Sequence, residues 1–378
     1  MGRRRRHDRC APKAVMRIGR LRFRRGARSL TEGAMFPASC APRRLRFAMS
    51  LRLCCCALLL ATARGPVCAA GDAEATPVPV ERVAQHVYLL RGAYTSGRQP
   101  DGNTVLFTGG AGWIVFDTGR HPEHSERILD FVRASGARVD AIVNSHWHLD
   151  HIGGNARIRA NQPDVRIYAS PAVDLAFATG LKDYRSRLQS RIDDPKSRAA
   201  DRQAWRREIA LIDSAAQLRP DVRIGGTRDR QIAGLRMRFG LEVDAVTGGD
   251  VWIYDRRSRV LAAGDLVTLP VPFFDTACAV RWSAALAGLE DLPFERLVPG
   301  HGAVLGRHQY TRYRMAFDAL LGCAAGSAPA SVCADAWIAA TGDLYAASDQ
   351  PRAREMLGSY FSQRLRAPAE QRDRHCPP

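Results

Sequence analysis

One short segment constrains this chain more than any other feature, because three histidines and one aspartate fall within six residues. Residues 145–154 read SHWHLDHIGG, after the β-branched run VDAIVNSH at 139–146, which predicts a buried strand. In extended backbone His146 and His148 share one face and can reach the same cation. Asp150 and His151 follow at a turn, where they can aim at a second position. Imidazole and carboxylate groups at this density favour zinc, the alternative being histidines of a solvated loop.

The elements around this segment alternate between strands and helices. Short apolar runs of strand length occur at 86–92, 104–109, 112–119, 139–146, 165–170, 222–226, 235–246, 250–255, 259–267 and 296–302. Helical spacing of apolar residues predicts helices over 124–134, 153–160 and 283–291, with a helical tail from about 304. This alternation predicts an α/β fold, a mixed sheet system with helices outside.

Residues 181–217 differ from their surroundings, because apolar residues at helical spacing lie among nine Lys+Arg and six Asp+Glu. The pattern predicts two amphipathic helices interrupted near Pro195. Two interpretations of this insert stay open. It is either a lid over the active site or a solvated helical hairpin packed on the domain.

The histidine-rich segment resembles the HxHxDH signature of the metallo-β-lactamase-fold hydrolases. Three further motifs resemble that family in the same order along the chain: Asp117-Thr118-Gly119, Gly264-Asp265 after the strand RVLAA, and Pro299-Gly300-His301-Gly302. The resemblance extends over most of residues 82–305. Within the family, the chain looks closest to the periplasmic, quinoprotein-associated zinc metallohydrolases.

The resemblance implies a four-layer αβ/βα sandwich over residues 82–305, with the helical insert 181–217 and a helical C-terminal extension, residues 306–378, packed on the domain. It also implies two metal sites at the edge between two sheets. Site one would take His146, His148 and a third histidine, and site two Asp150, His151 and His301, with Asp265 bridging the two. Asp150 would be the catalytic residue, since it would orient the attacking water and pass a proton to the leaving group.

One position departs from the family pattern. The third histidine of the family stands in a segment like HTxGD, and the matching segment here is Val246-Thr247-Gly248-Gly249-Asp250. Valine cannot bind a metal, so we expect one tightly held Zn²⁺ and a second that is weak or absent. Asp244 lies two residues earlier, on the same face as Val246 if the strand is regular, and its substitution for the histidine stays open.

These residues predict an exported zinc-dependent hydrolase, in which metal-activated water attacks an ester, thioester, lactam or phosphoester of a small-molecule substrate. The alternative is a catalytically impaired descendant that binds a metal or small molecule, because Val246 replaces a site-one histidine. A redox member of the fold is disfavoured, since those bind two irons with a fuller ligand set and need a flavin partner.

The N-terminal region carries most of the positive charge. Residues 1–48 hold 15 Lys+Arg against Asp8 and Glu32, out of a formal net charge of +18. A nucleic-acid-binding function for the whole chain is therefore not indicated. We interpret residues 1–48 as sequence upstream of the true start at Met49, the alternative being a basic nucleic-acid arm.

Residues 49–70 have the three parts of a secretory signal: a basic start, an apolar run from Leu53 to Thr62, and the small residues Cys68, Ala69 and Ala70. A buried helix at the start of a domain is the alternative. We expect a flexible leader at 71–81 and a periplasmic or secreted protein. No run of 18 apolar residues occurs, so stable membrane insertion is not expected.

Export permits disulfide bonds. Cys323 and Cys333 are ten residues apart, across a loop rich in small residues, and we expect them to close a helical hairpin. Two free buried thiols are the alternative. The sequence assigns no partner to Cys278 or Cys376.

Overall fold

The computed structural model describes residues 79–95 and 97–376. The expected upstream segment at 1–48, the signal at 49–70 and most of the leader lie outside the described residues. Within the described ranges, every helix is too short or too polar to cross a bilayer.

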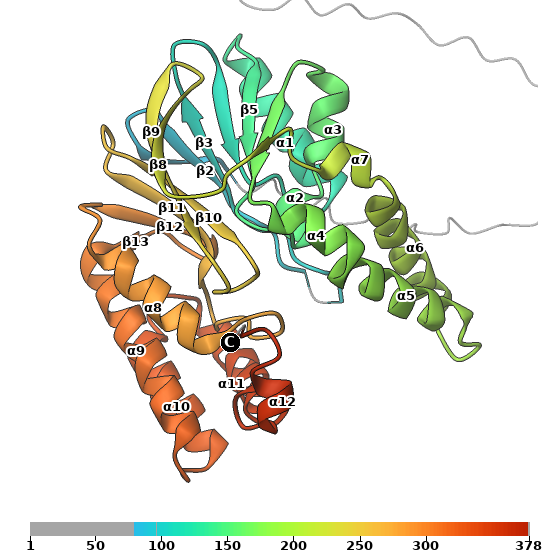
Figure 1. Ribbon diagram of the computed structural model, residues 1–378, viewed down its shortest axis with the longest axis vertical. Helices are drawn as coiled ribbons and strands as arrows, with labels where there is room; N and C mark the ends of the chain where they lie inside the picture. Colours follow the sequence, from blue (N-terminus) through green and yellow to red (C-terminus); the bar gives the residue numbers. More distant parts are fainter. Residues whose placement is uncertain (1–78, 96, 377–378) are drawn as a thin grey trace, which may run out of the picture. The chain divides into compact units, whose positions relative to one another are not determined.

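A seven-stranded mixed sheet forms the first half of the domain (Figure 1). Its order follows the chain, antiparallel through the first four strands and parallel from the fourth to the seventh. The strands are β1 (Glu81–Ala84), β2 (Val87–Leu90), β3 (Thr104–Thr108), β4 (Trp113–Phe116), β5 (Val139–Val143), β6 (Arg166–Ala169) and β7 (Val222–Arg223).

A six-stranded sheet forms the second half, in the order β13-β12-β11-β10-β9-β8. All its pairs are antiparallel except that of β11 with β12. The strands are β8 (Arg228–Ile232), β9 (Leu235–Glu242), β10 (Asp250–Asp255), β11 (Val260–Thr268), β12 (Arg296–His301) and β13 (Leu305–Gly306).

The central strands are buried on both faces, which explains their continuous apolar runs. In β10, Val251 and Ile253 face the core between the two sheets, where they join side chains of the first sheet. Trp252 and Tyr254 belong to a second cluster on the opposite face. Alternate residues of a strand point to opposite faces. One face of β10 therefore packs against the first sheet, and its other face packs against the helices.

Helices cover the outer faces and complete the four layers. Helices α1 (Pro122–Ala134) and α3 (Asn155–Asn161) pack on the first sheet. The second sheet is covered by α8 (Ala279–Glu290), α9 (Arg307–Ala325), α10 (Ala330–Thr341) and α11 (Gln350–Tyr360), followed by α12 (Ala369–Arg372). The expected metallo-β-lactamase sandwich with a helical C-terminal region is confirmed.

The insert is a helical hairpin with a cluster of its own. Helices α4 (Ala172–Ala178), α5 (Gly180–Asp193), α6 (Ala199–Asp213) and α7 (Ala215–Leu218) share this cluster with the one-turn helix α2 (Leu149–Ile152). Helices α5 and α6 lie antiparallel (Figure 1) and are interrupted at 194–198, as expected from Pro195.

Two of the strand boundaries that differ from the expected ones affect the site. The strand expected over 139–146 ends at Val143, and the strand expected over 235–246 ends at Glu242. Beyond Glu242, Asp244 adopts a left-handed φ of 57°, so the regular alternation that placed its side chain beside position 246 does not extend this far.

Candidate metal centre

The histidine-rich segment forms a loop that leads into a one-turn helix, rather than the end of a strand. His146 and His148 lie in the loop, and Asp150 and His151 in α2. The main chain there is fixed from outside, since Gly102 N donates to Asp150 O at 2.9 Å and Thr118 N donates to His151 O at 2.9 Å. The four side chains therefore converge through a change of backbone direction, not through strand alternation.

The described residues contain two groups of metal-ligating side chains, and each group has its ligand atoms within 4.8 Å of one another. The first group is His146, His148 and Asp265, and the second is Asp150, His151 and His301. Asp265, on β11, lies between them, with Oδ2 3.7 Å from His146 Nε2 and Oδ1 3.3 Å from His151 Nε2. The six residues predicted as metal ligands thus come together from three separate stretches of chain.

The last of these stretches is held in place by Asn103. Its side-chain amide donates to Pro299 O and Gly302 O, at 2.9 Å each, and its backbone NH donates to Gly300 O at 2.7 Å. These bonds attach the end of β12 to the start of β3. His301 Nε2 then lies 3.1 Å from Asp150 Oδ2.

Asp117 fixes the tautomers of two histidines. Its Oδ2 lies 2.9 Å from His151 Nδ1, so that nitrogen carries a proton and donates it. Ser145 Oγ donates to the same carboxylate at 2.7 Å and therefore accepts from His146 Nδ1 at 2.9 Å. In both rings the Nε2 lone pair is left toward the centre, as second-shell carboxylates arrange it in metal sites.

His148 is oriented by Thr276 instead. The Thr276 hydroxyl donates to Val246 O at 2.9 Å, and so it accepts from His148 Nε2 at 3.1 Å. The proton on Nε2 leaves Nδ1 of His148 as the nitrogen with a free lone pair. No signal in the sequence indicated that Thr276 orients His148.

Three buried polar atoms at the centre have no hydrogen-bond partner in the protein: His146 Nε2, His151 Nε2 and Asp265 Oδ1. An unpaired buried polar atom costs about 1–3 kcal/mol, so three at one point need a compensating ligand. Imidazole nitrogen and carboxylate oxygen suit zinc, and the residues present fit a metal ion.

The carboxylates around the candidate ligands create an electrostatic potential that favours positive charge. Burial lowers the pKa of His151, but Asp265, Asp117 and Asp150 outweigh burial and raise that pKa well above its usual range. Burial also lowers the pKa of His148 to about 4, which keeps this imidazole neutral at pH 7. A divalent cation would supply the positive charge that the three carboxylates attract.

Two glycines make room for the ligands. A β-carbon on Gly300 would lie 2.0 Å from Asp265 Oδ1, and one on Gly102 would lie 2.6 Å from His151 Cε1. Side chains cannot occupy either space without displacing a ligand residue.

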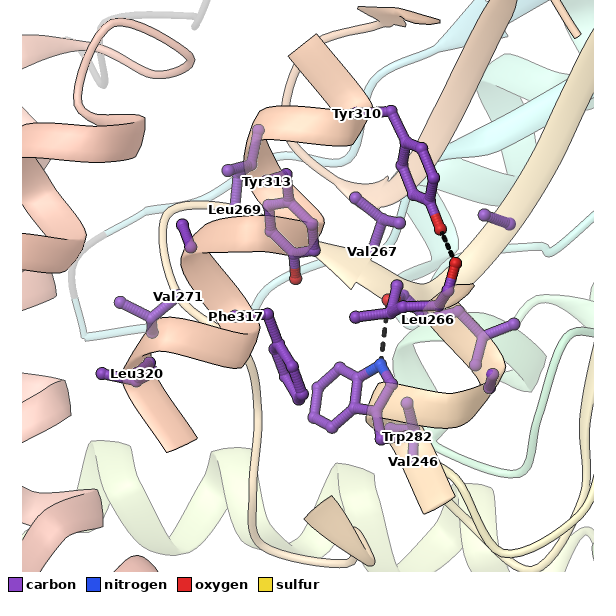
Figure 2. Close-up of a cluster of buried hydrophobic side chains, with 14 of the residues drawn as sticks. Val246, Leu266, Val267, Leu269, Val271, Trp282, Tyr310, Tyr313, Phe317 and Leu320 are labelled. Atoms are coloured by element: carbon purple, nitrogen blue, oxygen red, sulfur yellow. Dashed lines mark hydrogen bonds between the residues drawn. The ribbon is translucent and has the colours of Figure 1, made fainter. Parts of the chain in front are cut away.

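Val246 is fully buried in the apolar cluster under the C-terminal helices, together with Trp282 (Figure 2). Trp282 donates its indole NH to Leu266 O at 2.9 Å and is not among the residues that line the cleft. Asp244 belongs to neither ligand group among the described residues. The carboxylate of Asp250 accepts from Val246 N and Thr247 N at 2.9 Å each, which fixes the backbone of the segment without supplying a ligand.

Arg120 connects the centre to the helical insert. Its guanidinium lies 3.4 Å from Asp150 Oδ1 and 2.6 Å from Glu208 Oε1 on α6, and Tyr184 on α5 donates to Glu208 Oε2 at 2.7 Å. The insert is thus tied to a ligand residue by a partly buried network, and sequence reasoning assigned no role to Arg120.

Four of the six candidate ligand residues, His148, Asp150, Asp265 and His301, line the floor of a cleft of about 1200 Å³. Insert helices α4 and α5 form part of its lining, and the C-terminal residues from Asp349 to His375 form another part. The cleft is large enough for a drug-sized organic molecule.

Both cysteine pairs are disulfide-bonded. Cys323–Cys333 closes the hairpin of α9 and α10 as expected, with an S–S distance of 1.96 Å. Cys278, which had no assigned partner, is bonded to Cys376 at 2.08 Å, and this bond fixes the C-terminus beside the cleft.

Comparisons with known proteins agree with this geometry. The family model described as the metallo-beta-lactamase superfamily matches residues 97–301. A linear primary-alkylsulfatase of Pseudomonas sp. is 28% identical over 229 residues, which cover 55% of this chain and 43% of that protein. A hydroxyacylglutathione hydrolase of Synechococcus sp. is 41% identical over 51 residues, 14% of this chain and 20% of that protein. The chain thus spans less than half of the length of either relative.

Among solved structures, a metallo-beta-lactamase from Pontibacter korlensis aligns over 64% of this chain and 98% of its own, with 18% identity and a TM-score of 0.48. A double mutant of a sec-alkyl sulfatase aligns over 65% of this chain and 42% of its own, with 19% identity and a TM-score of 0.49. With the family model matching more than half of its residues, the chain belongs to the metallo-beta-lactamase superfamily.

Proposed function

We propose that this chain is a zinc-dependent hydrolase whose metal ligands are His146, His148, Asp150, His151, Asp265 and His301. One observation carries the proposal. The lone pairs of His146 Nε2 and His151 Nε2, together with Asp265 Oδ1, are buried at the same place without a partner, while Asp117 occupies the opposite nitrogen of His151 and, through Ser145, that of His146.

When bound, zinc lowers the pKa of water toward about 7 and polarises a carbonyl, phosphoryl or sulfuryl oxygen. Asp150 is the residue that moves the proton. Burial would raise the pKa of its carboxyl, but His151, His301 and Arg120 hold that pKa well below its usual range. An ionised Asp150 can accept a proton from the attacking water and pass it to the leaving group.

The two ligand groups differ in completeness. Asp265 is grouped with His146 and His148, but its Oδ1 also lies 3.3 Å from His151 Nε2 and 3.6 Å from His301 Nε2, so Asp150, His151 and His301 gain it as a fourth ligand. His146 and His148 have no third imidazole, since by the family resemblance Val246 stands where that histidine would be. We propose that the fuller set retains one zinc ion tightly and that the other group holds a second ion weakly or not at all.

The substrate is a small molecule with a hydrolysable acyl or phosphoryl bond: an ester, thioester, lactam or phosphoester. The names of the relatives extend this panel to alkyl sulfates and to hydroxyacylglutathione. A catalytically impaired, metal-binding protein is the second candidate, and the buried Val246 is the observation that favours it.

The test combines metal content with hydrolysis. Purified protein is analysed for zinc and assayed on chromogenic esters, lactams, phosphodiesters and sulfate esters. His151→Ala and Asp265→Ala are compared with His308→Ala, an exposed histidine of α9 that serves as the matched control. Hydrolysis lost in the first two variants and kept in the third supports the enzyme, whereas zinc without hydrolysis on any member of the panel supports the second candidate.

We also propose that the protein is exported. The signal pattern at 49–70 supports this, as do the two disulfide bonds, which persist in oxidising compartments. N-terminal sequencing of mature protein from expressing cells should begin near residue 71. A mature protein that begins before residue 49 would contradict export by this signal.

A further inference from the structure

We infer that the cleft selects a substrate with an apolar body and a negatively charged group at the end remote from the bond that is cleaved. The inference rests on the proposed function, since it places the reacting bond at the metal ligands. It is carried by how charge and apolar surface are arranged between the floor of the cleft and its rim.

The rim is cationic. Arg187 and Arg191 on α5, Arg352 on α11 and Arg374 near the C-terminus all line the cleft. None of the four forms an ion pair with an acid among the residues that the structure describes, whereas Arg364 in the same cleft is neutralised by Asp275 at 3.0 Å. Four arginines without acidic partners on two sides of one opening attract anions.

The acids of the cleft do not cancel this charge. Asp150 and Asp265 are ligand residues at the floor, and Asp101 accepts from the backbone NH groups of Arg120 and His121 at 2.6 and 2.8 Å. Only Asp183 and Asp349 remain near the rim without an ion-pair partner within the described part of the chain. The four arginines therefore leave an excess of positive charge at the opening.

Between floor and rim the lining includes apolar side chains. The ring centroid of Phe273 lies 6.1 Å from that of His148 and 5.9 Å from that of Tyr360 on α11, so this ring connects the ligand residues to the C-terminal wall. Farther out, Leu175 is 63% exposed and Tyr94 is 50% exposed, and both line the cleft. The cleft therefore offers apolar contact area on the way from its ligand residues to its arginines.

The C-terminal part of this wall is fixed covalently and by stacking. The Cys278–Cys376 disulfide lies two residues from Arg374, and Cys278 itself lies two residues from Thr276, which orients His148. Arg352 stacks on Tyr94, with its guanidinium carbon 3.6 Å from the ring centroid. Both arginines lie beyond the matched family region, so the C-terminal extension adds a recognition surface to the cleft.

The matching ligand is an amphiphilic anion: an aliphatic chain that ends in a carboxylate, sulfate or phosphate. The anionic end pairs with the rim arginines by charge-assisted hydrogen bonds, and the chain covers Leu175, Tyr94 and Phe273. The cleavable bond at the other end then reaches the floor.

Binding of two probes of equal length, octanoate and 1-octanol, tests this without catalysis. Calorimetry on the purified protein, with the metal it retains, should show octanoate binding at least about tenfold more tightly. The double variants Arg187→Gln/Arg191→Gln and Arg352→Gln/Arg374→Gln should each weaken octanoate about fivefold and leave 1-octanol unchanged, as expected for exposed charge pairs of about 1 kcal/mol. Arg228→Gln, an exposed arginine of β8, is the matched control.

The outcome separates this inference from the proposed function. Octanoate that binds through the metal ligands alone would be weakened by Asp265→Ala and not by the arginine variants, which would overturn the cationic rim. Equal affinity for octanoate and 1-octanol would overturn it too. The protein could also lack hydrolytic activity while both arginine double variants still lose octanoate affinity. That result would support the cationic rim and contradict the proposed hydrolase function.

Discussion

Oδ2 of Asp117 lies 2.9 Å from Nδ1 of His151, and both side chains are fully buried. The same carboxylate accepts from the backbone NH and the hydroxyl of Ser145, at 2.7 Å each. One side chain outside the six proposed ligands thus determines which nitrogen two histidines present. Asp117 also has a left-handed φ of 62°, a backbone conformation that aspartate and asparagine tolerate better than most residues.

Asp117→Ala should therefore weaken zinc binding about 10- to 100-fold, the usual effect of removing a second-shell partner. It should also lower stability, because three buried donors lose their acceptor. Asp117→Asn keeps the backbone preference and should lose less stability than alanine. Competition with a chelator and thermal unfolding measure both effects, with the exposed Asp130→Asn as control; unchanged zinc affinity in Asp117→Ala would refute the role of this residue.

Val246→His tests whether the missing imidazole limits the second ion. In metal-free protein the variant should be less stable by about 1–3 kcal/mol, because a polar ring enters an apolar cluster. With zinc, it should bind a second ion and hydrolyse substrate faster. If neither zinc content nor rate changes, the segment 246–250 does not bring position 246 to the metal.

Arg120→Ala should lower stability by about 3 kcal/mol, because Glu208 and Asp150 lose a buried partner. Since Arg120 helps to hold the pKa of Asp150 down, the acid limb of the pH–rate profile should move to higher pH. Arg120→Lys should restore part of both. A stability loss with an unmoved profile would mean that Arg120 only attaches the insert.

His124 gives the fold a pH dependence away from the ligands. Burial lowers the pKa of this imidazole from 6.5 to about 4, and its Nε2 bonds Thr104 Oγ1 at 2.8 Å. In the unfolded chain His124 binds a proton below about pH 6.5, whereas in the folded chain it binds one only below about pH 4. The free energy of unfolding should therefore decrease as the pH is lowered from about 6.5 to about 4, by at most about 1.4 kcal/mol per pH unit from this group.

Urea unfolding of wild type and His124→Gln between pH 4 and pH 7 measures this contribution as a difference in slope. His308→Gln, an exposed change, should keep the wild-type slope. Identical slopes in the wild type and His124→Gln would show that folding does not lower the pKa of this imidazole.

The two disulfide bonds should contribute unequally. By loop-closure entropy, a crosslink over 98 residues contributes about 4.7 kcal/mol and one over 10 residues about 2.7 kcal/mol. Cys278→Ser/Cys376→Ser should thus lower the free energy of unfolding more than Cys323→Ser/Cys333→Ser, as measured by urea unfolding. The reverse order would indicate that the C-terminus is held by its packing and not by the crosslink.

The sequence predicted the parts of this site that lie in short motifs. The 146–151 segment, the Gly264-Asp265 motif and His301 each carry a local signal, and their order along the chain indicated the fold. Long-range partners carry none. Nothing in sequence placed Thr276 on His148, or Arg120 between Asp150 and Glu208, because these contacts depend on how loops from separate layers meet.

Local geometry limited the prediction in a second way. Strand alternation was expected to align His146 with His148 and Asp244 with position 246. The first strand instead ends at Val143 and the second at Glu242, because the chain bends beyond each of these residues. The two-residue period of a strand predicts which side chains share a face only for residues that belong to the strand.

Zinc per chain tests the central claim most directly. Elemental analysis after exhaustive dialysis should give close to one zinc ion per wild-type chain, and less than a tenth of that in His151→Ala and in His301→Ala, with His308→Ala unchanged. No zinc in the wild type, or equal zinc in all four proteins, would contradict a metal centre built from these side chains.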